Sequence, residues 1–106
     1  MPFATEYERE IHFSKHGHNF GAANAIDYEN MADAFMFRPM TIGMRECIQP
    51  AGINRLRYGI VNRHLGVALV APPEFVKTFY QVPVHTIAHH GGHAPFFGHQ
   101  CARMDV

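Results

Sequence analysis

The sequence predicts an α+β domain in which two N-terminal helices pack on one face of a four-stranded antiparallel meander sheet. Two observations point to this fold class. Apolar residues recur at helical spacing before Pro39, whereas from Met44 onward short apolar runs alternate with turn signals. The chain has 106 residues, of which 47% are hydrophobic and 17% charged, and this composition suits one globular domain with a modest core.

The first predicted helix covers residues 6–16. Thr5 stands three residues before Glu8, which is the capping-box spacing, because a hydroxyl at the N-cap accepts a hydrogen bond from the backbone N–H three residues later. Gly17 is a natural stop for this helix.

A second helix is predicted to begin after the N-cap Asn24 and to end at Arg38-Pro39, since the residue before a proline disfavours the helical region. Its apolar residues follow the spacing i, i+3, i+4, i+7 and i+8: Tyr28, Met31, Ala32, Phe35 and Met36. We interpret this stripe as a surface that packs against the sheet, without a chemical role.

Four strands are predicted over residues 44–49, 53–61, 65–70 and 75–82. Within the second strand, Leu56 and Tyr58 alternate with Arg55 and Arg57, which is typical of a half-buried strand with one polar face. Connections of about three or four residues suit hairpins. Residues 83–106 are dominated by histidine, glycine and proline, and for them we expect an irregular tail.

Charge and cysteine content bound the functional classes. Nine Lys and Arg balance nine Asp and Glu, so the chain lacks the strongly basic character of many nucleic-acid-binding domains. No apolar run is long enough for a membrane span, and the first residues are charged too early for a signal peptide. Cys47 and Cys101 leave two states open, one disulfide or two free thiols.

The segment IHFSKHGHNFG gathers three histidines and a lysine. His12 and His16 lie four residues apart and share a helix face, with Lys15 beside them. Two such imidazoles can bind zinc, but the metalloprotease pattern requires a glutamate where Phe13 stands. General acid–base catalysis without a metal fits better, because histidine titrates near neutral pH and lysine stabilises an anion. Surface histidines on a polar helix face are the alternative.

Two predicted strands carry groups that could bind a phosphate. Arg55 and Arg57 lie on the second strand, and Lys77, Thr78 and Tyr80 lie on the last. Guanidinium groups match phosphate oxygens in a two-pronged geometry, and hydroxyl groups add orientation. Strand alternation puts Thr78 and Tyr80 on one face and Lys77 on the other. Solvated strand faces are the alternative.

The C-terminal segment contains six potential metal ligands. Zinc could use three of its histidines and its cysteine, and copper or nickel could also bind. Their spacing is irregular and fits no standard zinc-finger pattern, so adventitious affinity or no role is the preferred interpretation. These residues are His85, His89, His90, His93, His99 and Cys101.

Taken together, five segments resemble the C-terminal toxin domains of bacterial polymorphic toxins, in the superfamily that includes barnase, EndoU, colicin-type tRNases and RelE. The resemblance covers about residues 11–82, and the Lys-His-Gly element and the order of segments are its most specific features. The segments are HFSKHGHNFGA, DYENMADAFM, EC, RLRYGIVNRHLGVAL and FVKTFY. Two positions depart from the pattern: Leu65 replaces a phenylalanine, and Gln81 replaces a basic residue whose phosphate contact Lys77 could supply.

The resemblance implies a metal-independent endoribonuclease without a cofactor, with RNA as substrate and tRNA as one candidate. It also implies an antibacterial toxin that is secreted or injected and acts in the cytoplasm of the target bacterium. A cognate immunity protein would be its partner, presenting carboxylates to the basic site residues. No oligomeric state and no delivery route follow from the sequence.

The same resemblance assigns roles at the site. His16 is the general base or acid, with His12 or Tyr80 as its counterpart, and the product is a 2′,3′-cyclic phosphate. The phosphorane and its oxygens are stabilised by Lys15, Arg57 and Thr78. This interpretation requires His16 and Arg57 to lie around one opening. Two alternatives remain: a non-catalytic RNA- or protein-binding module of the same fold, and a metal-binding domain built on the histidine-rich tail.

Overall fold

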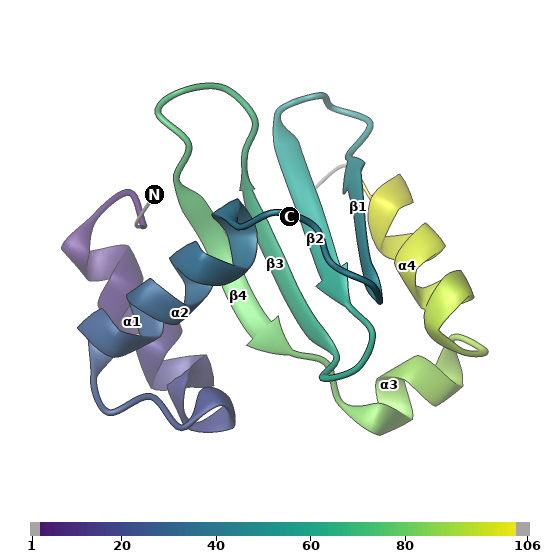
Figure 1. The fold of residues 1–106 in the computed structure, drawn as a ribbon, viewed down its shortest axis with the longest axis horizontal. Helices are drawn as coiled ribbons and strands as arrows, with labels where there is room; N and C mark the ends of the chain where they lie inside the picture. Colours follow the sequence, from purple (N-terminus) through teal and green to yellow (C-terminus); the bar gives the residue numbers. More distant parts are fainter. Residues whose placement is uncertain (1–2, 104–106) are drawn as a thin grey trace.

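The computed structural model describes residues 3–103 and confirms the α+β fold (Figure 1). Among these residues, no helix is long and apolar enough to span a membrane. The order of elements along the chain is α1 (Glu6–His16), the 3-10 helix η1 (Gly17–Phe20), α2 (Ala25–Phe37), β1 (Met44–Ile48), β2 (Asn54–Gly59), β3 (His64–Leu69), β4 (Val76–Gln81), α3 (Val84–His89) and α4 (His93–Ala102).

The four strands form one antiparallel sheet in the order β1-β2-β3-β4, as predicted for a meander, and each predicted strand agrees with the structure to within about two residues at either end. Paired residues form rows that run across the strands, and two successive rows carry different side chains. Arg57, Gly66 and Phe79 lie opposite one another, and the next row joins Tyr58, Leu65 and Tyr80. Because neighbouring residues of a strand point to opposite faces, these two rows lie on opposite faces of the sheet.

Local side-chain bonds start the two N-terminal helices where the sequence predicts. Thr5 Oγ1 accepts a hydrogen bond from the Glu8 N–H at 3.1 Å, and Asn24 Oδ1 accepts one from the Asp27 N–H at 2.8 Å. Each bond satisfies a backbone donor that has no partner inside the helix. The helix α2 ends at Phe37, directly before Arg38-Pro39, as expected.

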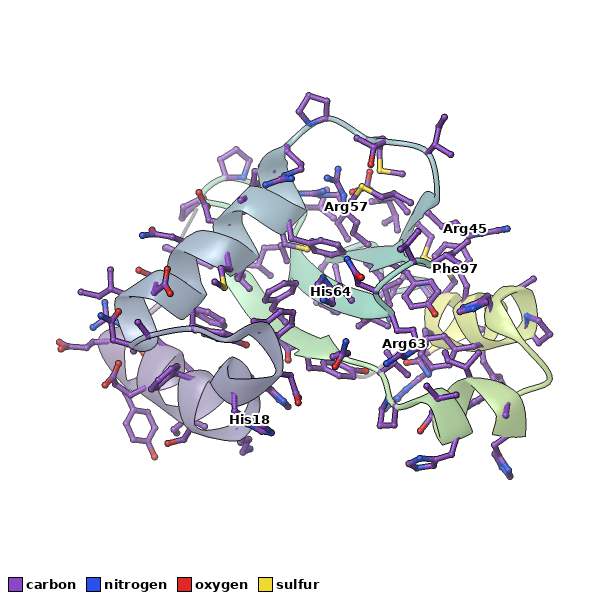
Figure 2. All side chains as sticks on the ribbon, turned by 60° about the horizontal axis from the view of Figure 1, so that its bottom comes forward. His18, Arg45, Arg57, Arg63, His64 and Phe97 are labelled. Atoms are coloured by element: carbon purple, nitrogen blue, oxygen red, sulfur yellow. A yellow bond between two sulfur atoms is a disulfide. The ribbon has the colours of Figure 1, made fainter. Side chains whose placement is uncertain are left out.

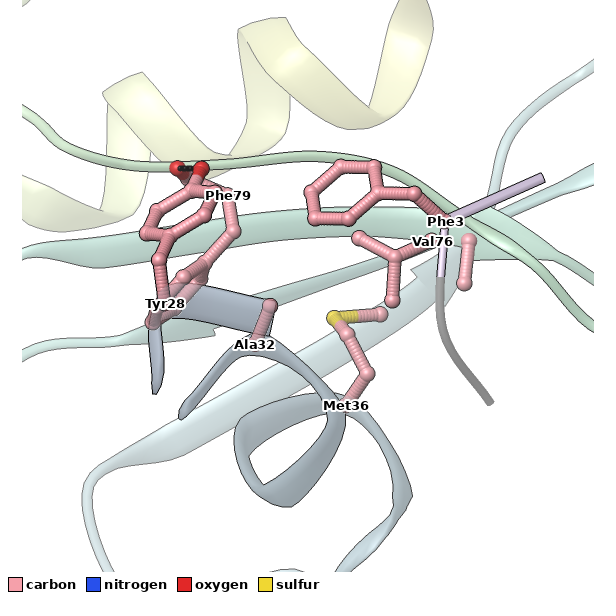
Figure 3. Packing of buried hydrophobic residues seen from close by; sticks show 7 residues of the cluster. Phe3, Tyr28, Ala32, Met36, Val76 and Phe79 are labelled. Atoms are coloured by element: carbon pink, nitrogen blue, oxygen red, sulfur yellow. Dashed lines mark hydrogen bonds between the residues drawn. The ribbon is translucent and has the colours of Figure 1, made fainter. Parts of the chain in front are cut away.

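The apolar stripe of α2 forms the first core, against β3 and β4 (Figure 3). Tyr28, Ala32 and Met36 are fully buried, and the Tyr28 hydroxyl donates to the Phe79 carbonyl. Gly66 permits the close approach of α2, because a Cβ at this position would lie 2.4 Å from Met36 Sδ. This packing confirms the interpretation of the stripe as core.

The prediction of an irregular tail over residues 83–106 is wrong for the part that the structure describes, since α3 and α4 form there. They cover the second face of the sheet, where the buried Ile87 and Phe96 pack with Leu56, Tyr58, Leu65, Val67 and Val82. The physical reason is tertiary: one face of β2 and β3 is mostly apolar and has to be covered. Neither helix has a side-chain N-cap bond, so the usual local start signal is missing.

The two cysteines form a disulfide that joins β1 to α4. Cys47 and Cys101 have Cα atoms 6.2 Å apart, and they lie 54 positions apart in the sequence. Next to this bridge, Gln49 Nε2 donates to the Gln100 carbonyl at 2.9 Å, in a buried position. The sequence leaves open one disulfide or two free thiols, and the structure contains the disulfide.

Candidate active site

Three predicted site residues lie together where α1 meets β4. Along α1, the rings of His12 and His16 have centroids 6.1 Å apart. The ring of Tyr80, from β4, lies 5.4 Å from that of His16. On the far side of His12, the Phe3 ring stacks at 5.2 Å. We call His12, His16 and Tyr80 the α1–β4 row.

Burial sets the protonation states in this row. It lowers the pKa of His12 and, together with the neighbouring charges of His12, Lys15 and His18, also lowers the pKa of His16. Both imidazoles are therefore neutral near pH 7, and each offers an unprotonated nitrogen. Burial raises the pKa of Tyr80, so its phenol keeps its proton at the same pH. The row thus combines proton acceptors with a proton donor.

His12 is the more enclosed of the two imidazoles. Its Nδ1 is buried and lacks a hydrogen-bond partner among the described residues, and its Nε2 lies 3.7 Å from Glu8 Oε2. The Glu8 carboxylate opposes the effect of burial and raises the pKa of His12, although burial dominates. His12 therefore faces Glu8 of its own helix. His16 lies between the rings of His12 and Tyr80.

The other predicted groups of this site lie on the same two elements. Lys15 is exposed and close enough to influence both imidazoles electrostatically. Thr78 is half-buried and pairs with Val67, so it shares a sheet face with Tyr80 as predicted. Lys77 lies at an irregularity in the pairing of β3 and β4. One residue that the sequence analysis did not single out, Arg103, is near enough to Tyr80 to lower its pKa against the effect of burial.

The structure does not bring Arg57 to this row. Its guanidinium is buried, with 5% of the residue exposed, and donates to the carbonyls of Phe35 at 3.0 Å and Arg38 at 2.7 Å. Its Nε lies 3.2 Å from Glu46 Oε1. Figure 2 shows Arg57 at the C-terminal end of α2, well away from His18, which follows His16 by two residues. The expected opening between His16 and Arg57 is therefore absent from the described residues.

The reason is that the end of a helix leaves carbonyl groups without partners. Arg55 Nη1 donates to the Met36 carbonyl at 2.9 Å and also pairs with Glu46, so both arginines of β2 cap α2. The two guanidinium groups hold the pKa of Glu46 below its usual range although burial opposes them. Alternation in a strand predicts which face an arginine occupies, but it does not reveal that a helix end covers that face.

The histidines of the C-terminal segment have partners of other kinds. His93 Nδ1 lies 2.7 Å from the Tyr58 hydroxyl, and His90 Nδ1 lies 3.0 Å from His99 Nδ1. The bridged Cys101 has no thiolate to offer a metal. Across residues 3–103, no group of three or more His, Cys, Asp or Glu side chains is arranged to hold a metal ion. His85 and His89 are exposed.

A cleft with a volume of about 860 Å³ lies between α2, η1 and the sheet. We call it the α2 cleft. His64, at the start of β3, lies in it and contacts the ring of Phe20 at 4.7 Å (Figure 2). Residues 62–64 connect the second and third predicted strands, so the sequence predicts a turn there and does not single out this histidine. No local spacing marks it, because its neighbours come from η1, α2 and β4.

The partly buried imidazoles predict that stability falls in mild acid. Burial lowers the pKa of His12, His16 and His64, so the unfolded chain binds protons first as the pH drops below about 6.5. The free energy of unfolding should therefore be smaller at pH 5.5 than at pH 7.5. Urea titrations at both values measure it, and H64Q should reduce the difference. Equal midpoints for the wild type would contradict this expectation.

No family model, curated protein or solved structure significantly matches this chain. The functional interpretation therefore depends on the chemistry of the side chains described above. Two places offer such chemistry: the α1–β4 row and the α2 cleft.

Proposed function

We propose that this domain is a metal-independent endoribonuclease and that it acts as an antibacterial toxin. The observation that supports the activity is the α1–β4 row, in which two neutral imidazoles and a protonated phenol lie in contact. Cleavage of RNA at a ribose 2′-hydroxyl needs one group to accept a proton and another to donate one. The row contains both kinds of group beside the cation of Lys15.

In the proposed reaction, His16 accepts the proton of the 2′-hydroxyl through its unprotonated ring nitrogen. The 2′-oxygen then forms a bond to phosphorus, and the bond from phosphorus to the 5′-oxygen breaks. Tyr80 donates a proton to that leaving oxygen, with His12 as the alternative donor. The products are a 2′,3′-cyclic phosphate and a free 5′-hydroxyl, so protons and bonds balance.

The developing negative charge on the phosphorane needs cations and hydrogen-bond donors close by. Lys15 supplies a cation next to His16, and Arg103 supplies one near Tyr80. The Thr78 hydroxyl, on the face of β4 that carries Tyr80, can donate to a phosphate oxygen. Arg57 is left out of this proposal, because Glu46 and two helix carbonyls already occupy its guanidinium.

The biological role rests on the resemblance of residues 11–82 to toxin domains. An antibacterial ribonuclease would act in the cytoplasm of a target cell, and the producing cell would need an immunity protein. Such a partner would block the site most simply by presenting carboxylates to Lys15 and Arg103, because opposite charges favour the encounter and the bound state.

The test is to incubate the purified domain with total RNA, with and without EDTA, and to map the new ends. We expect cleavage at equal rates in both samples, and fragments that carry 2′,3′-cyclic phosphates. Cleavage that EDTA abolishes would support the metal-dependent alternative instead. Binding of RNA without any cleavage would support the non-catalytic module.

A further inference from the structure

We propose that the α2 cleft binds a nucleobase. In assigning that base to an RNA substrate the proposal rests on the proposed function, but the cleft's chemistry can be tested without cleavage. The cleft lies on the sheet face that α2 covers, whereas the side chain of Tyr80 lies on the opposite face of the sheet. Its volume of about 860 Å³ is in the range of sites for small organic ligands.

Aromatic rings form the floor of the cleft. Phe20 stacks on Phe79 with centroids 4.1 Å apart, and Phe35 lies 5.1 Å from Phe79. The His64 ring meets Phe20 edge-on. Phe20, Phe35 and His64 are only partly buried, so they leave ring surface open to a ligand. A planar heterocycle stacks on such surfaces, and each stacked base contributes about 1–3 kcal/mol to binding.

Four side-chain amides stand on the walls of this floor, each from a different part of the chain: Asn19, Asn30, Asn62 and Gln81. Gln81 Nε2 donates to the backbone carbonyl of Asn62 at 3.1 Å, which joins β4 to the turn between β2 and β3. An amide offers both donors and acceptors, as does the edge of a nucleobase. Burial lowers the pKa of His64, and the neutral ring likewise offers one donor and one acceptor.

The charge of the lining favours a ligand that carries a phosphate. Within the described range, residues 3–103, no Asp or Glu lines the cleft, and Arg38 is the only Lys or Arg in its lining. Arg38 Nε donates to the Ala34 carbonyl at 2.8 Å, and no carboxylate pairs with its guanidinium among residues 3–103. A guanidinium on the rim attracts a phosphate group. An aliphatic ligand would displace water from these amides without offering them hydrogen-bond partners in return, which costs affinity.

The cleft and the α1–β4 row are connected through the chain at two places. The helix η1 begins directly after His16 and contributes Asn19 and Phe20 to the cleft, and Gln81 follows Tyr80. In this proposal, an RNA strand whose base lies in the cleft passes the end of β4, where Gln81 follows Tyr80, to reach the row. The cleft thus acts as the base-recognition site for an RNA strand whose cleavage occurs at the row.

The experiment uses the full chain with H16A, so that binding is measured without the proposed catalytic base. The four nucleoside 3′-monophosphates and ribose 5-phosphate are titrated while amide chemical shifts are followed by NMR. We expect at least one nucleotide to bind about tenfold more tightly than ribose 5-phosphate. The largest shifts should fall on Phe35, Asn62, His64 and Gln81.

Three variants in the same background sharpen this test. N62A and R38Q should each weaken nucleotide binding about five- to tenfold. R45Q is the matched control and should leave binding unchanged. Arg45 is an exposed arginine of β1 that pairs with Tyr58, on the sheet face opposite the cleft. The proposal fails if the shifts lie outside the cleft, if ribose 5-phosphate binds equally well, or if N62A and R38Q have no effect.

Cleavage by the wild type is measured separately. Nucleotide binding in the cleft without any RNA cleavage would support the base site and contradict the proposed ribonuclease activity. RNA cleavage with nucleotides bound elsewhere would support the ribonuclease activity and contradict the base site.

Discussion

Substitution H16A is expected to lower the rate of RNA cleavage by about 10²- to 10⁴-fold, which is the usual contribution of a general acid or base. His16 is the central ring of the α1–β4 row, and it is the group whose neutral state allows it to accept the 2′-hydroxyl proton. Initial rates on a labelled RNA measure the effect. Because His16 is only half-buried, the variant should still fold, which circular dichroism checks.

The matched control is H85A, which removes an exposed histidine of α3 and should leave the rate within about twofold of the wild type. The pH profile gives a second readout. The rate should rise with pH as His16 loses its proton, and this rise should disappear in H16A. Equal rates for wild type and H16A would remove His16 from the mechanism.

Loss of the disulfide is expected to lower the free energy of unfolding by about 4 kcal/mol in the chain-entropy estimate. The bridge joins residues 54 positions apart, so it strongly restricts the unfolded chain. It also ties α4 to β1, one of the two edge strands of the sheet. The measurement is urea unfolding of the double variant C47S/C101S beside the oxidised wild type, monitored by circular dichroism.

A reducing agent supplies the control for this prediction. It should lower the unfolding midpoint of the wild type to that of the double variant, and it should leave the double variant unchanged. Identical midpoints for oxidised wild type and double variant would show that the bridge contributes nothing. If the domain acts in a reducing cytoplasm, as proposed above, the same measurement gives the stability of the form that would meet its substrate.

Much of the fold follows from local patterns that physical chemistry makes specific. The hydrogen bonds at Thr5 and Asn24 form three residues downstream, so their spacing predicts where each helix begins. Likewise, the i, i+4 spacing of His12 and His16 places both on one side of α1. The pairing of Tyr80 with His16 was expected only through the resemblance to toxin domains.

Other features depend on contacts that no local pattern contains. The alternation of Arg57 with apolar residues along β2 predicts a solvated cation, yet the end of α2 and Glu46 bind its guanidinium. His64 has the spacing of a turn residue, yet rings from three other elements surround it. In both cases the deciding partner lies far away in the sequence.

The order of the residues was sufficient to predict the two N-terminal helices, the meander and the histidine pair of α1, because these arise from interactions between near neighbours. The folded chain alone showed the helices at the C-terminus, the disulfide, the burial of Arg57 and the α2 cleft. These features arise where the two faces of the sheet are covered, and that covering depends on which distant apolar and polar groups meet.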